Sequence, residues 1–218
     1  MKKVWRVTER MKEPFCGLSH GLGVVLAVVA LIVLLVLANG RPWHTLGFAI
    51  YGATLVMLYT ASTLYHSLKV GPHAEAWLMR IDQSAIFLLI AGSYTPLCLV
   101  TLRGTWGWSL LGVVWGLALF GIACTLLWHR APPVGRVVLY VLMGWLVVLA
   151  AEPLRAVWPP AAFNWLLAGG VIYSVGTVIF AVDKPHLWPG KFSAHDLWHL
   201  FVLGGSACHF VVMARFVA

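Results

Sequence analysis

The chain has 218 residues, of which 61% are hydrophobic and only 10% are charged, and its mean hydropathy is +0.88. This composition excludes an ordinary soluble domain and indicates an integral membrane protein. The formal net charge is +8. Because no basic soluble domain accompanies the apolar runs, we interpret the charge as an anchor to the anionic inner leaflet and expect no nucleic-acid site.

Seven apolar runs of membrane-spanning length follow one another, separated by short connections rich in glycine and proline. The sequence therefore predicts an all-α integral membrane protein with one seven-helix domain over residues 1–218, of which residues 1–16 form an amphipathic cytoplasmic leader. The first run is about 22 residues long, which exceeds a signal-peptide core, so we expect it to stay in the mature chain. The predicted spans are 17–38, 45–66, 82–101, 106–128, 134–151, 161–182 and 195–217.

The distribution of Lys and Arg predicts the orientation. Segments on the N-terminal side of the bundle hold 11 of the 15 Lys and Arg residues, and the opposite side holds four. By the positive-inside rule, the N-terminus lies in the cytoplasm and, with seven spans, the C-terminus lies outside. We accordingly expect a multi-pass protein of the inner (cytoplasmic) cell membrane.

The last apolar run opens with His195 and His199, in the sequence HDLWH. Residues i and i+4 lie on one face of a helix about one turn apart, so both imidazoles can reach one metal ion. Ionisable side chains at the edge of a membrane helix are costly and tend to mark function. From this pair alone two interpretations remain open, a metal site or two interfacial histidines whose polar tips reach the head groups.

More polar residues are predicted at the same cytoplasmic level. The second predicted helix ends there with Ser62 and His66, and the third begins there with Asp82. Imidazoles suit zinc, and three protein ligands with a fourth position open to water are typical of a catalytic site. The sequence thus predicts a Zn²⁺ site whose ligands are His66, His195 and His199. The alternatives are that Asp82 caps its helix and that Ser62 bonds to its own helix backbone.

The inner end of the first predicted helix allows two interpretations. Glu13 and Pro14 favour helix initiation, because Pro is tolerated in the first turn and Glu suits the positive end of the helix dipole. Ser19 and His20 follow within two turns, and His20 is either an interfacial histidine or part of a functional motif. The residues by themselves assign no role to Glu13, Ser19 or His20.

Two polar residues of the last run are predicted to lie outside the metal site. Asp196 points about 100° away from His195 around the helix, so we expect a helix N-terminal charge rather than a ligand. His209 lies about 15 Å further along the helix than His199, at a rise of about 1.5 Å per residue. We therefore expect His209 to be a hydrogen-bonded core histidine.

Small residues and one proline are expected to shape the packing. The pairs Gly17/Gly21 and Gly112/Gly116 have the GxxxG spacing, which we interpret as close packing within the bundle, leaving a homo-oligomer open. Pro96 is expected to kink the third helix. The fourth to sixth helices carry almost no ionisable side chains, and we expect only packing there. The four cysteines have no CxxC spacing and are expected to be small buried apolar residues, namely Cys16, Cys98, Cys124 and Cys208.

Taken in order, these motifs resemble the hemolysin III family of the progestin and adipoQ receptor group. The resemblance implies a seven-helix bundle with a cytoplasmic N-terminus and zinc held near the inner face by His66, His195 and His199. It also implies that Asp82 and Ser62 flank the zinc-bound water. Gln83 stands where many bacterial members have His. The motifs are Glu13 with Ser19-His20, Ser62-x-x-x-His66, Asp82 with AGSYTP at 91–96, and His195-x-x-x-His199.

The leading functional hypothesis is a zinc-dependent intramembrane hydrolase of lipid amides or esters, similar to ceramidases, with membrane lipids as substrate or ligand. Asp82 would act as general base or orient the water, and Ser62 would donate a hydrogen bond to the developing oxyanion. The alternative is a non-enzymatic regulator of membrane-lipid homeostasis with structural zinc. A pore-forming haemolysin gains little support because the central helices lack a polar lining. A retinal protein is excluded because the last run contains no Lys.

Overall fold

The computed structural model of the chain describes residues 11–128, 132–185, 187–188 and 192–218. Seven helical segments in these residues are long and apolar enough to cross a membrane, which confirms the predicted all-α seven-helix architecture. The elements are α2 (Pro14–Ala38), α3 (Pro42–Ser67), α4 (Pro72–Pro96), η1 (Leu97–Thr101), α5 (Thr105–Leu127), α6 (Pro133–Trp145), η2 (Leu146–Ala150), α7 (Ala151–Val157), α8 (Pro160–Val182), α9 (Ala194–Val212) and η3 (Met213–Val217).

Local sequence explains where the helices begin. Five of them have proline in the first turn, where the missing N–H removes no helical hydrogen bond. The last long helix, α9, begins instead with a capping box in which Ser193 accepts from the backbone N–H of Asp196 and the Asp196 carboxylate accepts from that of Ser193. Asp196 is therefore the helix N-terminal charge that its position predicts.

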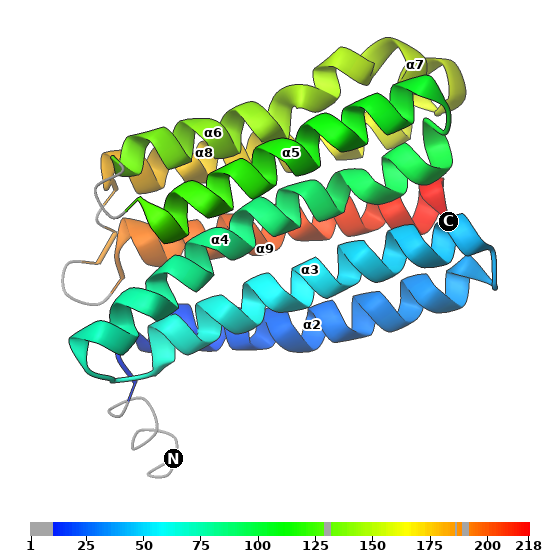
Figure 1. Cartoon of the computed structure of the whole chain (residues 1–218). Coiled ribbons are helices and arrows are strands. Elements are labelled where there is room, and N and C mark those ends of the chain that lie inside the picture. The colour runs from blue at the N-terminus through cyan, green and yellow to red at the C-terminus, as the bar shows by residue number, and fades with distance from the viewer. Residues whose placement is uncertain (1–10, 129–131, 186, 189–191) are drawn as a thin grey trace.

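The helices form one bundle in which α9 runs between α2 and α8 (Figure 1). The start of α2 and the end of η3 lie at opposite ends of the bundle, as an odd number of spans requires (Figure 1). The beginning of α2, the end of α3 and the beginning of α9 share the N-terminal end. The Tyr59 hydroxyl donates to the Ser206 hydroxyl at 2.9 Å, and the hydroxyls of Tyr173 and Ser206 share a hydrogen bond of 2.8 Å. These bonds tie α3, α8 and α9 together deeper in the bundle.

The third span is predicted to begin at residue 82, but its helix begins at Pro72. The preceding segment carries charges that hide it from a hydropathy search, yet it is rich in the good helix formers Ala, Glu, Leu and Met. Asp82 consequently lies about three turns inside α4, and the interpretation of Asp82 as a helix cap is wrong. Residues 14–16 belong to α2 and not to the leader. Residues 1–10 of that leader, together with His129 and His186, lie outside the described residues.

Other packing predictions had mixed outcomes. Gly17 and Gly21 face Ser67 and Thr63 of α3 as expected, but an added Cβ at Gly112 or Gly116 would meet open space, so that pair does not pack within the bundle. Cys16, Cys98 and Cys208 are buried, whereas Cys124 is only half-buried. Pro96 ends the regular part of α4, and the chain continues as the π-helical turn η1.

Candidate metal centre

Three histidines far apart in the sequence meet at the N-terminal end of the bundle. His66 comes from the last turn of α3, and His195 and His199 come from the first turns of α9. The ring centroids of His66 and His199 are 4.7 Å apart, those of His66 and His195 are 5.0 Å apart, and those of His195 and His199 are 5.1 Å apart. The structure therefore brings together the three residues predicted as ligands.

Cys16 of α2 belongs to the same cluster. One ligand atom from each of Cys16, His66, His195 and His199 can be chosen so that all lie within 4.8 Å of one another. Zinc–nitrogen distances of about 2.0–2.1 Å and a zinc–sulfur distance of about 2.3 Å require ligand separations of roughly 3.3–3.6 Å in a tetrahedron. Side-chain rotations that draw the atoms together by about 1 Å satisfy this requirement. The four side chains can thus hold a metal ion.

A buried ring nitrogen supports this fit. Within the described part of the chain, Nδ1 of His199 is buried and has no hydrogen-bond partner. A buried polar atom without a partner is costly, and coordination to a metal would satisfy it. His66 and His199 are 1% and 2% exposed, whereas His195 is half-buried. The interfacial alternative for the pair His195 and His199 is therefore wrong for His199.

Glu13 holds His66 through both its backbone and its side chain. The Glu13 amide donates to the carbonyl oxygen of His66 at 2.8 Å, and the Glu13 carboxylate is hydrogen-bonded to Nδ1 of the His66 ring. This hydrogen bond lowers the pKa of the Glu13 carboxyl, against the partial burial that raises it. A carboxylate on one ring nitrogen fixes the tautomer and leaves Nε2 of His66 for a metal. The sequence indicates that a helix starts at Glu13 and Pro14, but no sequence pattern predicts the contact between Glu13 and His66.

The interpretation of His20 as an interfacial histidine is also wrong. Its side chain is 3% exposed, its Nδ1 lies 2.8 Å from the Ser62 hydroxyl oxygen, and its ring centroid lies 3.8 Å from that of His199. Ser62 and Asp82 line the same cavity as His66. Among the described residues, the hydroxyl of Ser62 is therefore hydrogen-bonded to His20 and not to its own helix backbone. Ser19 donates to the carbonyl oxygen of Cys16 at 3.1 Å.

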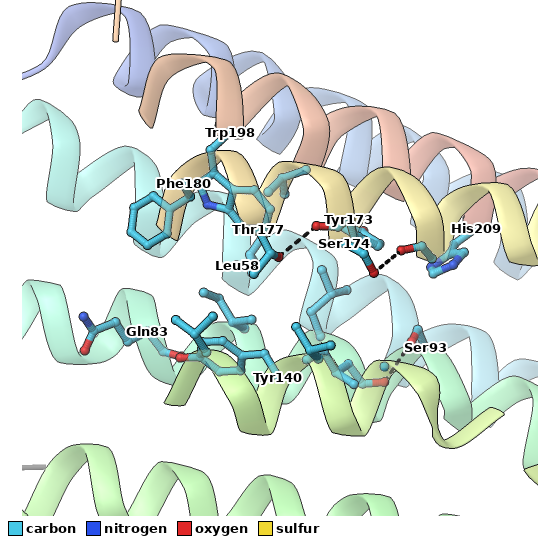
Figure 2. Close-up of a pocket in the computed structure, with 18 of the residues that line it drawn as sticks. Leu58, Gln83, Ser93, Tyr140, Tyr173, Ser174, Thr177, Phe180, Trp198 and His209 are labelled. Carbon is cyan, nitrogen blue, oxygen red and sulfur yellow. Dashed lines mark hydrogen bonds between the residues drawn. The ribbon is translucent and has the colours of Figure 1, made fainter. Parts of the chain in front are cut away.

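The histidine cluster forms one end of a cavity of about 430 Å³ between the helices. Ser62, Asp82 and the three histidines line that end, and the wall continues along α9 to His209 and on to Met213 of η3. Figure 2 shows Tyr140 of α6 and Tyr173 of α8 on opposite sides of this space. The expectation that the fifth and sixth spans serve only packing is therefore wrong. His209 lines the cavity beside the Tyr173 ring and is outside the metal cluster.

Known proteins resemble the chain over nearly its full length. Residues 8–210 match the family described as "Haemolysin-III related". The chain is 40% identical to Hemolysin-3 of Bacillus cereus over 99% of this chain and 97% of that protein. It is also 40% identical to the Hemolysin-3 homolog of Bacillus subtilis over 89% of each chain.

A more distant relative is the monocyte to macrophage differentiation factor of Homo sapiens, at 26% identity over 91% of this chain and 82% of that protein. This similarity supports the wider progestin and adipoQ receptor group that the motifs indicate. Four matched motifs, seven membrane spans and the bacterial matches agree: the chain belongs to the hemolysin III family of multi-pass bacterial cell-membrane proteins.

Proposed function

We propose that the protein is a zinc-dependent hydrolase that cleaves an amide or ester bond of a membrane lipid within the bilayer. One observation carries this proposal: a single cavity of about 430 Å³ is lined at one end by the histidine cluster and along most of its length by apolar side chains. Small-molecule sites have volumes of about 300–1,000 Å³. The apolar length suits an acyl chain, and the polar end suits the bond to be cleaved.

Zinc is the metal that this donor set favours. Imidazole and thiolate ligands suit zinc, whereas magnesium and calcium prefer oxygen donors. His66, His195 and His199 would hold the ion, and Glu13 would orient His66 through its hydrogen bond. Zinc bound there would lower the pKa of a coordinated water to about 7 and polarise the lipid carbonyl.

The neighbouring side chains supply the rest of the chemistry. Asp82 lines the cavity without belonging to the ligand cluster, so it is free to accept a proton from water and return it to the leaving amine or alcohol. Ser62 lines the same end, and its hydroxyl can donate to the developing oxyanion while His20 holds its position. Most of the cavity wall is apolar, and low-dielectric surroundings strengthen both interactions.

A second candidate function is a lipid-responsive regulator in which the metal is structural. The observation that favours it is the fourth donor, Cys16, because a metal bound by Cys16, His66 and His199 would tie α2, α3 and α9 together. Four protein ligands are the usual structural arrangement of zinc.

Fatty-acid release from lipids separates the two functions. The purified, zinc-loaded protein is placed in bilayers containing ceramide-like amides or ester lipids, with metal-free protein and Asp82→Ala as controls. Zinc-dependent release that Asp82→Ala abolishes is the expected result. If none of the lipids is hydrolysed while one zinc per chain is measured, the regulator is the better proposal.

A further inference from the structure

We propose that Cys16 is a fourth protein ligand, so that its thiolate and three imidazoles close the metal site in the absence of substrate. The inference rests on the metal site of the proposed function and adds a regulatory element to it. With four protein ligands the tetrahedron is complete. Water can then bind the metal only after the Cys16 thiolate has left it.

The backbone holds Cys16 firmly beside the histidines. Cys16 lies in the first turn of α2 and is 2% exposed. Immediately before it, the amides of Lys12 and Glu13 donate to the carbonyl oxygens of Ser67 and His66 at 3.3 and 2.8 Å. These bonds fix the start of α2 to the end of α3, so the backbone of Cys16 stays close to His66 while its thiol can still turn about the Cα–Cβ bond.

Its closeness to histidine ring nitrogens distinguishes Cys16 from the other cysteines. Among the described residues, Cys16 is the cysteine whose sulfur falls within 4.8 Å of ligand atoms from three histidines. Cys98 is equally buried at 2% exposure but lies in η1, at the opposite end of the α4 span. Burial alone accounts for a cysteine such as Cys98. It does not account for a thiol converging with three imidazoles that come from two other helices.

The thiol proton also has an acceptor in place. Sγ of Cys16 donates to Oδ1 of Asp196 at 3.1 Å, while Oδ2 of Asp196 accepts from the backbone N–H and the hydroxyl of Ser193 at 2.7 and 2.8 Å. If Cys16 bound the metal, an S–metal bond would replace the S–H bond, and the proton would pass to this carboxylate. Because Asp196 is half-buried, the proton can continue from there to solvent.

Cobalt substitution tests the proposal directly on the full-length protein. Co²⁺ occupies tetrahedral zinc sites, and a bound thiolate gives a near-ultraviolet sulfur-to-cobalt charge-transfer band. We expect the band in the wild type and in the matched control Cys98→Ser, and its loss in Cys16→Ser. Loss of a ligand should weaken metal binding by at least the roughly 10- to 100-fold that loss of an outer contact costs. A wild-type protein with one Co²⁺ per chain and no such band would overturn the proposal, and so would a band that persists in Cys16→Ser.

Zinc-edge X-ray absorption of the wild type gives an answer even if Cys16→Ser does not fold. One sulfur at about 2.3 Å from zinc is expected beside nitrogen at about 2.0–2.1 Å. A shell of nitrogen and oxygen only would contradict ligation by Cys16 and leave the three-histidine site intact. Failure of the protein to bind any metal would instead contradict the proposed function itself.

Discussion

The Glu13 carboxylate and Nδ1 of His66 form a hydrogen bond that joins the first turn of α2 to the last turn of α3. Such a contact orients a metal-binding imidazole and raises its basicity. We therefore expect Glu13→Ala to weaken zinc binding about 10- to 100-fold while the bundle stays folded. Competition titration with a zinc chelator measures this affinity.

The matched control for Glu13 is Glu75→Ala. Glu75 forms an ion pair with Lys12 at 2.7 Å, near the same end of the bundle, but it is outside the metal cluster. Zinc affinity should be unchanged in this variant. Equal losses in both variants would mean that the start of α2 contributes to binding through general stability and not through the His66 ring.

Two of the three α9 histidines that line the cavity, His199 and His209, should behave differently. His199 belongs to the ligand cluster, whereas His209 lies outside it and about 15 Å further along the helix. We expect His199→Ala to lose stoichiometric zinc and His209→Ala to retain one zinc per chain. Elemental analysis of the purified proteins decides the question, and the same metal content in both would refute the assigned ligand set.

Substitution of Asp82 tests turnover separately from metal binding. Because Asp82 lines the cavity outside the ligand cluster, Asp82→Ala should retain zinc. Fatty-acid release should fall by about 100- to 10,000-fold, the usual contribution of a general base. Asp183→Ala, at the end of α8, serves as a control that leaves the cavity intact. Loss of zinc from Asp82→Ala to the extent seen with His199→Ala would make Asp82 a ligand and not a base.

Metal removal should destabilise the folded bundle. The cluster joins α2, α3 and α9, so an ion bound there favours the folded state by mass action. Free zinc at about 100 times its dissociation constant should add roughly 2.7 kcal/mol to the free energy of unfolding. Thermal unfolding in detergent, with and without a chelator, measures this difference. His199→Ala should show no response to the chelator, and a full response in that variant would place the stabilising metal elsewhere.

The orientation in the membrane is a further prediction from the Lys and Arg distribution. Reporter fusions should place the N-terminus and the connections near Gly71, Pro133 and Lys184 in the cytoplasm, with Ala218 outside. The 11 to 4 bias in Lys and Arg is the physical reason. Cytoplasmic reporter activity from a fusion at Ala218 would contradict it.

The sequence by itself determined the architecture and part of the site. Hydropathy identifies seven spans because each must satisfy its own backbone in lipid, and prolines mark five helix starts. The spacing of four residues between His195 and His199 places both on one face of α9, because that face repeats about every 3.6 residues. The capping role of Asp196 is also local, because its partner Ser193 lies three residues away in the sequence.

Only the tertiary structure decided which residues, far apart in the sequence, meet at the metal cluster. Cys16 contacts Asp196 across a separation of 180 residues, and Glu13 contacts His66 across 53. No periodic pattern in the sequence predicts either contact, because each depends on how α2 packs against α3 and α9. The cavity is likewise a product of packing: Tyr140 and Tyr173 stand in apolar runs that mark no site, and their place on its wall follows from how α6 and α8 pack in the bundle.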